Sequence, residues 1–129
     1  MKFNGTHYRS IWFDQKVNHV KIIDQRWLPH QFKIVSLLSL KDFEVAIRDM
    51  WVRGAPLIGA TAAYGVAVQM QQDPSDNSLE KTWGKLHSTR PTAINLKWAL
   101  DRCKSTLLPL PECDRALIAM ELAHEICNE

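Results

Sequence analysis

The sequence has no segment that would take the chain to or through a membrane. Residues 1–14 are polar and aromatic, and they lack the apolar core and small-residue cleavage site of a signal peptide. The longest apolar stretch, Ala55 to Met70, contains a proline, two glycines, a threonine and a glutamine, and it is too short to span a bilayer. We therefore expect a protein that has no membrane partner.

A strong excess of charge and a paired set of cysteines are also missing. The 16 basic and 14 acidic side chains leave a net charge of +2 and are spread along the chain, so this balance does not indicate binding to nucleic acid. Three cysteines, Cys103, Cys113 and Cys127, are odd in number and show no spacing typical of disulfide-bonded loops. Without an export signal, they predict reduced thiols in a cytoplasmic protein.

What the sequence does contain begins with strand-like segments. Ser10–Phe13 and Val20–Ile23 are short β-branched and aromatic runs separated by polar turn residues, and Gln31–Leu38 is a candidate third strand. Residues 1–38 are therefore predicted to form a small subdomain with an antiparallel sheet.

From Ser39 onward the apolar residues repeat with the period of a helix. Ser39 and Asp42 have the spacing of a capping box, and the helix that they start is predicted to end at Gly54. The predicted helices begin near Leu40, Pro56, Leu79, Pro91 and Asp114. Residues 39–129 are thus expected to form a helical subdomain. The fold class is α+β, with a small N-terminal antiparallel sheet followed by a helical bundle.

The helix after Pro56 is apolar on nearly all sides and rich in small residues. A helix of this composition has to be buried, with its neighbours in close backbone approach. Glycine inside a helix costs roughly 1 kcal/mol relative to alanine, and close packing explains its presence. We expect four residues of this helix inside the core, namely Gly59, Ala62, Ala63 and Val66.

Two segments place an arginine just before a proline at a predicted helix start. In the first, Arg53, Gly54 and Ala55 precede Pro56, where first-turn N–H groups and the helix dipole favour an anion. Gly54 would let a ligand approach the backbone, and Arg53 adds a forked, permanently charged donor. The alternative is a corner between two helices, in which Gly54 is only a C-terminal cap and Arg53 is solvated.

The second segment covers residues 87–96 and has Arg90 immediately before Pro91. Ser88 or Thr89 would cap the following helix, which is the commoner use of such residues. The functional interpretation makes Arg90 a second ligand for a phosphate or hydroxyl group, converging with the first segment. The residues alone leave both interpretations open.

These two segments closely resemble the methylthioribose-1-phosphate isomerases of methionine salvage. The resemblance covers the chain from end to end, and its most specific part is the Arg-Gly-Ala-Pro sequence. It is carried by Ile47–Gly65, by Ser88–Leu96 and by an amino-terminal pattern of Ile11-Trp12-Phe13, Asp24-Gln25 and Leu28-Pro29. Related families are ribose-1,5-bisphosphate isomerases, deoxyribose-1-phosphate-type isomerases and regulatory subunits of the translation initiation factor 2B exchange factor. The intact Arg53 and Arg90 favour a sugar-phosphate binder over the translation-factor branch.

The resemblance implies a reaction and a division of roles. The family converts the cyclic aldose 5-methylthioribose 1-phosphate to the ketose 5-methylthioribulose 1-phosphate, without a metal or nucleotide cofactor. It implies that Arg53, Gly54, Ala55 and Arg90 bind the substrate. The family's catalytic cysteine and aspartate lie in a carboxy-terminal Rossmann-like domain that is absent from this sequence. We therefore expect no catalytic residue here and no activity of the chain alone.

Partners and alternative functions follow from the same resemblance. We expect a sugar phosphate as ligand, and either a homo-oligomer (a dimer in the family) or association with the carboxy-terminal half. Two alternatives stay open: a non-catalytic binding or assembly module, and an isomerase of another pentose 1-phosphate. Cys103 is expected to be a small core residue. His124 and Cys127 are too few ligands for zinc, so no metal site is expected.

Overall fold

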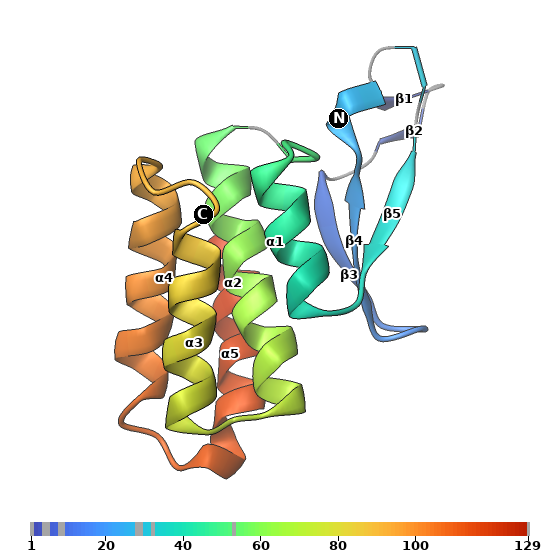
Figure 1. Ribbon diagram of the computed structural model, residues 1–129. Helices are drawn as coiled ribbons and strands as arrows, with labels where there is room; N and C mark the ends of the chain where they lie inside the picture. The colour runs from blue at the N-terminus through green and yellow to red at the C-terminus, as the bar shows by residue number, and fades with distance from the viewer. Residues whose placement is uncertain are drawn as a thin grey trace.

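A small antiparallel sheet stands beside a bundle of helices (Figure 1). The structure, a computed structural model, describes residues 2–3, 6–7, 10–27, 30–31, 33–52 and 54–128. Within these residues it contains a three-stranded sheet, a separate pair of two-residue strands and five α-helices. The predicted α+β class is therefore confirmed.

The strands form where the β-branched runs predicted them. They are β1 (Lys2–Phe3), β2 (Thr6–His7), β3 (Ile11–Asp14), β4 (His19–Ile23) and β5 (Ile34–Leu37), with the short 3-10 helix η1 (Gln25–Trp27) after β4. β1 pairs with β2, and β3, β4 and β5 lie in that order, all antiparallel. Ile11 lies opposite Ile22, and Val20 opposite Leu37; all four are buried and join the core of the helices. The third strand is shorter than predicted, because it begins only at Ile34.

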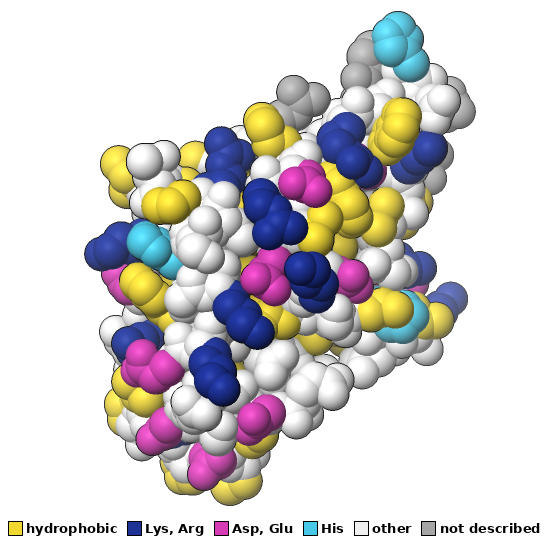
Figure 2. All heavy atoms as spheres, in the orientation of Figure 1, with side chains coloured by type: hydrophobic (Ala, Val, Ile, Leu, Met, Phe, Trp, Pro, Cys, Tyr) yellow, Lys and Arg dark blue, Asp and Glu magenta, His cyan; other side chains and the backbone are white. Residues whose placement is uncertain are grey.

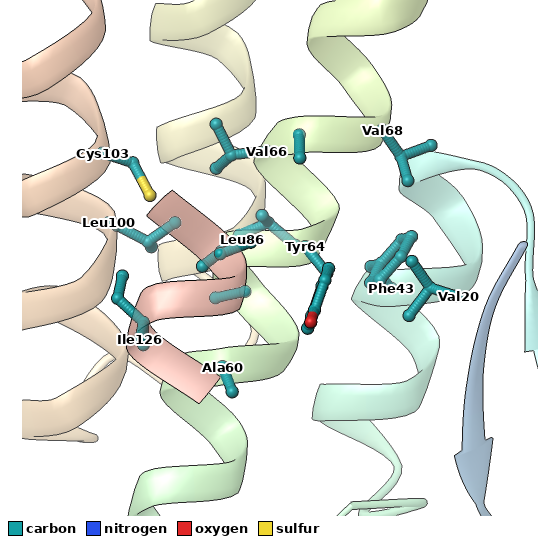
Figure 3. Packing of buried hydrophobic residues seen from close by; sticks show 14 of the residues in the cluster. Val20, Phe43, Ala60, Tyr64, Val66, Val68, Leu86, Leu100, Cys103 and Ile126 are labelled. Atoms are coloured by element: carbon teal, nitrogen blue, oxygen red, sulfur yellow. The ribbon is translucent and has the colours of Figure 1, made fainter. Parts of the chain in front are cut away.

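One central helix organises the bundle. The helices are α1 (Leu40–Arg48), α2 (Ala55–Gln72), α3 (Asp76–His87), α4 (Ile94–Leu107) and α5 (Glu112–Cys127). α2 contacts each of the other four, and every residue from Ile58 to Val68 is buried. Figure 3 shows Phe43, Leu86, Leu100 and Ile126, one from each neighbouring helix, packed around it. The four core residues predicted for this helix are buried, as expected.

The end of α1 differs from the prediction. Its start at the Ser39–Asp42 capping box is confirmed, but it ends at Arg48 and not at Gly54. Met50 adopts the left-handed conformation with φ 62°, its N–H donates to the carbonyl of Ile47, and the N–H of Trp51 donates to that of Ala46. This is a Schellman motif, which usually has glycine at the left-handed position. Because methionine occupies that position, the sequence alone did not reveal the end of the helix.

The start of α4 also differs. Pro91 was expected to open this helix, but α4 begins at Ile94, and Pro91 lies in a turn closed by the Ala93 N–H donating to the Arg90 carbonyl (3.0 Å). Proline at the second position of such a turn has its preferred backbone angle. Ser88 and Thr89 do not cap α4: their hydroxyls donate to carbonyls in the last turn of α3.

α3, by contrast, is longer than the predicted helix over residues 79–86, because Ser75 caps it from Asp76. None of the helices in the described ranges, α2 included, is long and apolar enough to cross a membrane.

Candidate functional site

A cavity lies where the N-terminal ends of α2 and α4 meet. Its volume is about 660 Å³. It is lined by Met50, Gly54, Ala55, Ile58, Arg90, Thr92, Ala93, Ile94, Asn95 and Leu96. The two sequence segments that were predicted to converge on one ligand therefore do meet in space, across the packed surface between α2 and α4.

The two helix ends at this cavity differ from the other helix starts that the structure describes. Neither Gly54, the N-cap of α2, nor Ala93, the N-cap of α4, provides a side-chain hydrogen bond, and neither first turn contains an acidic residue. The first turns of α1, α3 and α5 each contain a carboxylate. A carboxylate there compensates the positive end of the helix dipole. The two ends at the cavity keep that positive end available for an anion from outside the chain.

Gly54 has a specific backbone role at this site. Its φ of 95° lies in the region that side chains disfavour, and apart from its two chain neighbours no atom of the described residues lies within 4 Å of where its Cβ would be. Glycine is therefore required by conformation and not by packing. It leads directly into the first turn of α2, where Ala55 and Leu57 carry N–H groups that have no acceptor within the helix and Pro56 carries none.

Among the described residues that line the cavity, Arg90 carries the one charged side chain. It is half-buried, and no described residue forms an ion pair or side-chain hydrogen bond with it. The other arginines whose side chains the structure describes do have such partners, namely Arg26, Arg48, Arg102 and Arg115. A guanidinium without a carboxylate, next to two uncompensated helix ends, is well suited to bind a phosphate.

The remaining lining combines two polar side chains with an apolar wall. Thr92 and Asn95 supply a hydroxyl and an amide, and Met50, Ile58, Ile94 and Leu96 supply the apolar surface. The sequence did not predict Thr92 and Asn95 as ligands, although both lie in the segment that follows Arg90. No carboxylate, histidine or cysteine is among the described lining residues. The described cavity therefore has groups that bind a polar anionic ligand, and no group of the kind that usually transfers a proton.

Three of the four predicted ligands come together at this cavity. Gly54, Ala55 and Arg90 line it, whereas Arg53 lies outside the described residues. Among the described residues no three histidine, cysteine or acidic side chains gather as a metal-binding group. Figure 2 shows basic and acidic side chains intermingled over the visible face, without a large region of one sign.

Cys103 lies in the core and not at the cavity. Burial raises the pKa of its thiol to about 12. The reactive form of a cysteine is the thiolate, so Cys103 is an inert core residue near neutral pH.

Comparison with known proteins gives relatives that match the whole chain. No family model matches. The chain is 61% identical over all 129 residues to methylthioribose-1-phosphate isomerase from Cereibacter sphaeroides, and 50% identical to that of Escherichia coli, and it spans 35% of the length of each.

Two solved structures share the fold. One is 5-methylthioribose 1-phosphate isomerase from Pyrococcus horikoshii, 33% identical with a TM-score of 0.83. The other is translation initiation factor eIF-2B, subunit delta, from A. fulgidus, 29% identical and also with a TM-score of 0.83. Each match covers 93% of this chain and 36% of the other. The fold alone thus fits both groups. Along its whole length the chain is similar to methylthioribose-1-phosphate isomerases, with 57–61% identity to three of them, and it spans about 35% of their length.

Proposed function

We propose that this chain is the amino-terminal, sugar-phosphate-binding part of an enzyme that converts 5-methylthioribose 1-phosphate to 5-methylthioribulose 1-phosphate. One observation carries the proposal: Gly54, Ala55 and Arg90, from two separate segments, line the same cavity at two uncompensated helix ends. The 61% identity along the whole of this chain to an isomerase of that name supports the choice of substrate. The reaction needs no metal or nucleotide cofactor, and we place it in the cytoplasm as part of methionine salvage.

The substrate phosphate would lie between the first turn of α2 and the guanidinium of Arg90. The N–H groups at Ala55 and Leu57 and the charge of Arg90 offset its negative charge, and Arg53 adds a second guanidinium from the adjoining segment. Thr92 and Asn95 line the same cavity, where their side chains would bind the hydroxyl groups of the sugar. The phosphate on C1 blocks ordinary ring opening. Holding this phosphate in place also orients C1 and C2, the two carbon atoms between which the hydrogen is shifted.

The chemical step itself requires groups that we place outside this chain. By family resemblance, a cysteine and an aspartate of the carboxy-terminal domain perform it. We propose that this domain, or a second copy of the chain in a dimer, contacts the exposed apolar side chains near the cavity, Ile94 and Trp98.

The first prediction separates binding from turnover. The purified 129-residue chain is expected to bind inorganic phosphate or ribose 1-phosphate weakly at the cavity, and not to convert 5-methylthioribose 1-phosphate. Binding is followed by the shifts of the Gly54 and Ala55 amide signals, and conversion by the appearance of the ketose. Turnover that copurifies with the chain would show that the catalytic groups are present here after all.

The second prediction concerns the two arginines in an enzyme that contains this chain together with the carboxy-terminal domain. Arg90→Ala and Arg53→Ala are each expected to lower kcat/KM about ten- to hundredfold, because a charge-assisted contact contributes about 1.5–3 kcal/mol. Lysine at either position restores only part of the loss, since it lacks the planar fork.

Arg102→Ala is the matched control for this prediction. It removes a cation from the same helix as the cavity residues, but that cation pairs with Glu125 and does not line the cavity. It should leave kcat/KM within about twofold, as for most surface ion pairs. Equal losses for Arg90→Ala and Arg102→Ala would contradict a specific phosphate site.

A further inference from the structure

A buried carboxylate lies outside the cavity, at the junction of β4 and η1. Asp24 is 1% exposed. Its oxygens accept hydrogen bonds from Arg26 Nε (3.0 Å) and Nη2 (2.6 Å), from the Arg26 backbone N–H (3.1 Å) and from Trp27 Nε1 (3.1 Å). Its own N–H donates to the Lys33 carbonyl at 2.8 Å. Asp24 is thus held from several directions.

These contacts keep Asp24 charged although it is buried. Burial alone would raise the pKa of the carboxyl, but the hydrogen bonds from the side chain and backbone of Arg26 outweigh that effect and hold the pKa below its ordinary value. The charged carboxylate in turn fixes the Arg26 guanidinium, because a two-point arginine–carboxylate contact constrains the guanidinium in orientation as well as in distance.

Arg26 carries this constraint to the loop between α1 and α2. Its guanidinium carbon lies 4.7 Å from the centre of the Trp51 ring. The Trp51 carbonyl accepts from the N–H of Gln25 (2.9 Å), and its N–H donates to the Ala46 carbonyl (2.9 Å). Trp51 Nε1 is buried and has no hydrogen-bond partner among the described residues. Stacking on Arg26 therefore contributes to the orientation of the ring, which its own N–H does not fix.

Trp51 lies between Met50 and Gly54, the two described residues of this loop that line the cavity. Met50 precedes it and Gly54 follows three positions later, and both line the cavity while Trp51 does not. Met50 has a positive φ of 62°, and such a backbone conformation persists only where the surroundings enforce it. Val52, next to Trp51, is fully buried. Hence the path of the loop past the cavity depends on how firmly Trp51 is held.

We propose that Asp24 is a positioning residue for the anion cavity. By fixing Arg26 against Trp51, it holds the loop in the conformation that brings Met50 and Gly54 to the cavity wall. Asp24 touches no ligand and acts through the loop. The inference rests on the proposed function, since it assigns Asp24 to the same phosphate site.

Asp24→Asn in the 129-residue chain tests the inference, with inorganic phosphate as the probe. Asparagine keeps an acceptor for Trp27 but loses the charge that fixes Arg26. Phosphate is expected to bind about tenfold more weakly, because small displacements of a preorganised site have large effects. The measurement uses the Gly54 and Ala55 amide shifts at a temperature where parent and variant are both folded. Hydrogen exchange at the Trp51 amide, which is bonded to Ala46, is expected to accelerate in the same variant.

Three further variants make the test specific. Asp14→Asn removes a carboxylate of the same sheet that pairs with Lys21 at 3.1 Å, and it should leave phosphate binding unchanged. Arg26→Lys keeps a cation beside Trp51 without the two-point contact. It should therefore weaken phosphate binding less than Asp24→Asn does. Trp51→Leu removes the stacked ring and should weaken binding as Asp24→Asn does. It replaces that variant if Asp24→Asn does not fold.

The outcomes separate this inference from the proposed function. If the parent binds phosphate and the folded Asp24 and Trp51 variants bind it equally well, the proposed function stands and Asp24 has only a structural role. Equal weakening by Asp14→Asn would likewise overturn the inference, since the effect would then reflect general destabilisation. If the parent does not bind phosphate at millimolar concentration, the phosphate site fails, and the inference fails with it.

Discussion

Replacing Arg115 with methionine is expected to lower the free energy of unfolding by about 3–5 kcal/mol, because several carbonyl groups lose a charged donor at a cost of about 1–3 kcal/mol for each one left buried. Arg115 is 3% exposed although it carries a full charge. Its guanidinium donates to the carbonyls of Leu107 (3.0 Å), Leu108 (3.0 Å) and Leu110 (3.2 Å) at the end of α4, and to that of Pro74 (2.8 Å).

The size of this effect follows from the carbonyl groups that would lose their donor. Carbonyls at a helix C-terminus have no partner within the helix, and a buried unsatisfied group costs about 1–3 kcal/mol. Arg115 also pairs with Asp76 at 2.7 Å in the first turn of α3, so one side chain joins α5 to the ends of two other helices. Methionine keeps an apolar chain of similar length, which limits the loss to the polar contacts.

Urea denaturation of the parent and of the variant measures the difference. Arg102→Met is the control, because Arg102 pairs at the surface with Glu125, and such pairs contribute less than about 1 kcal/mol. Arg115→Lys should recover only part of the stability, since one ammonium group does not reach four carbonyls. A loss for Arg115→Met no larger than that for Arg102→Met would show that water satisfies the carbonyls equally well.

Gly59→Leu is expected to destabilise the chain by about 3 kcal/mol or more, or to prevent folding, because overpacking a dense core typically costs about 1–3 kcal/mol and occasionally more. A Cβ at Gly59 would lie 3.2 Å from the backbone carbonyl oxygen of Asn95 and 3.5 Å from Cβ of Ala99, both on α4. The carbonyl belongs to the first turn of α4 and moves only with the helix. A larger side chain therefore pushes α4 away from α2, at the place where the two helix ends form the cavity.

Gly84 provides the matched control for this substitution. It lies within α3, and apart from its chain neighbours and the backbone of its own helix no atom of the described residues is within 4 Å of the position that its Cβ would take. Gly84→Ala should stabilise the chain by up to about 1 kcal/mol, because it removes the backbone cost of glycine in a helix without creating a clash. The two midpoints of thermal unfolding should move in opposite directions. If Gly59→Leu melts with the parent, α2 and α4 are not packed as closely as the structure has them.

The order of strands and helices could be predicted from sequence because local rules are sufficient for it. The period of the apolar residues changes from two to that of a helix near Ser39, and the Ser39–Asp42 capping box marks the helix start in sequence and structure alike. The small residues of α2 predicted its burial correctly. The predicted helix end at Gly54 and the predicted helix start at Pro91 were wrong, because methionine was not expected in a left-handed cap at position 50 and proline serves a turn as well as a helix start.

The candidate site shows the same division between local and distant effects. The amino-acid sequence by itself indicated the four proposed ligands, Arg53, Gly54, Ala55 and Arg90, since each belongs to a short motif next to a helix start. It also showed the similarity to methylthioribose-1-phosphate isomerases along the whole chain. Only the tertiary structure decided that the ends of α2 and α4 meet, and that Thr92 and Asn95 share their cavity. It also decided that Asp24 and Arg115 are buried charges. Arg115 donates to the carbonyl of Pro74, 41 residues away along the chain, and Arg26, which Asp24 fixes, lies against the Trp51 ring. Residues that distant are brought together only by the packing of whole elements.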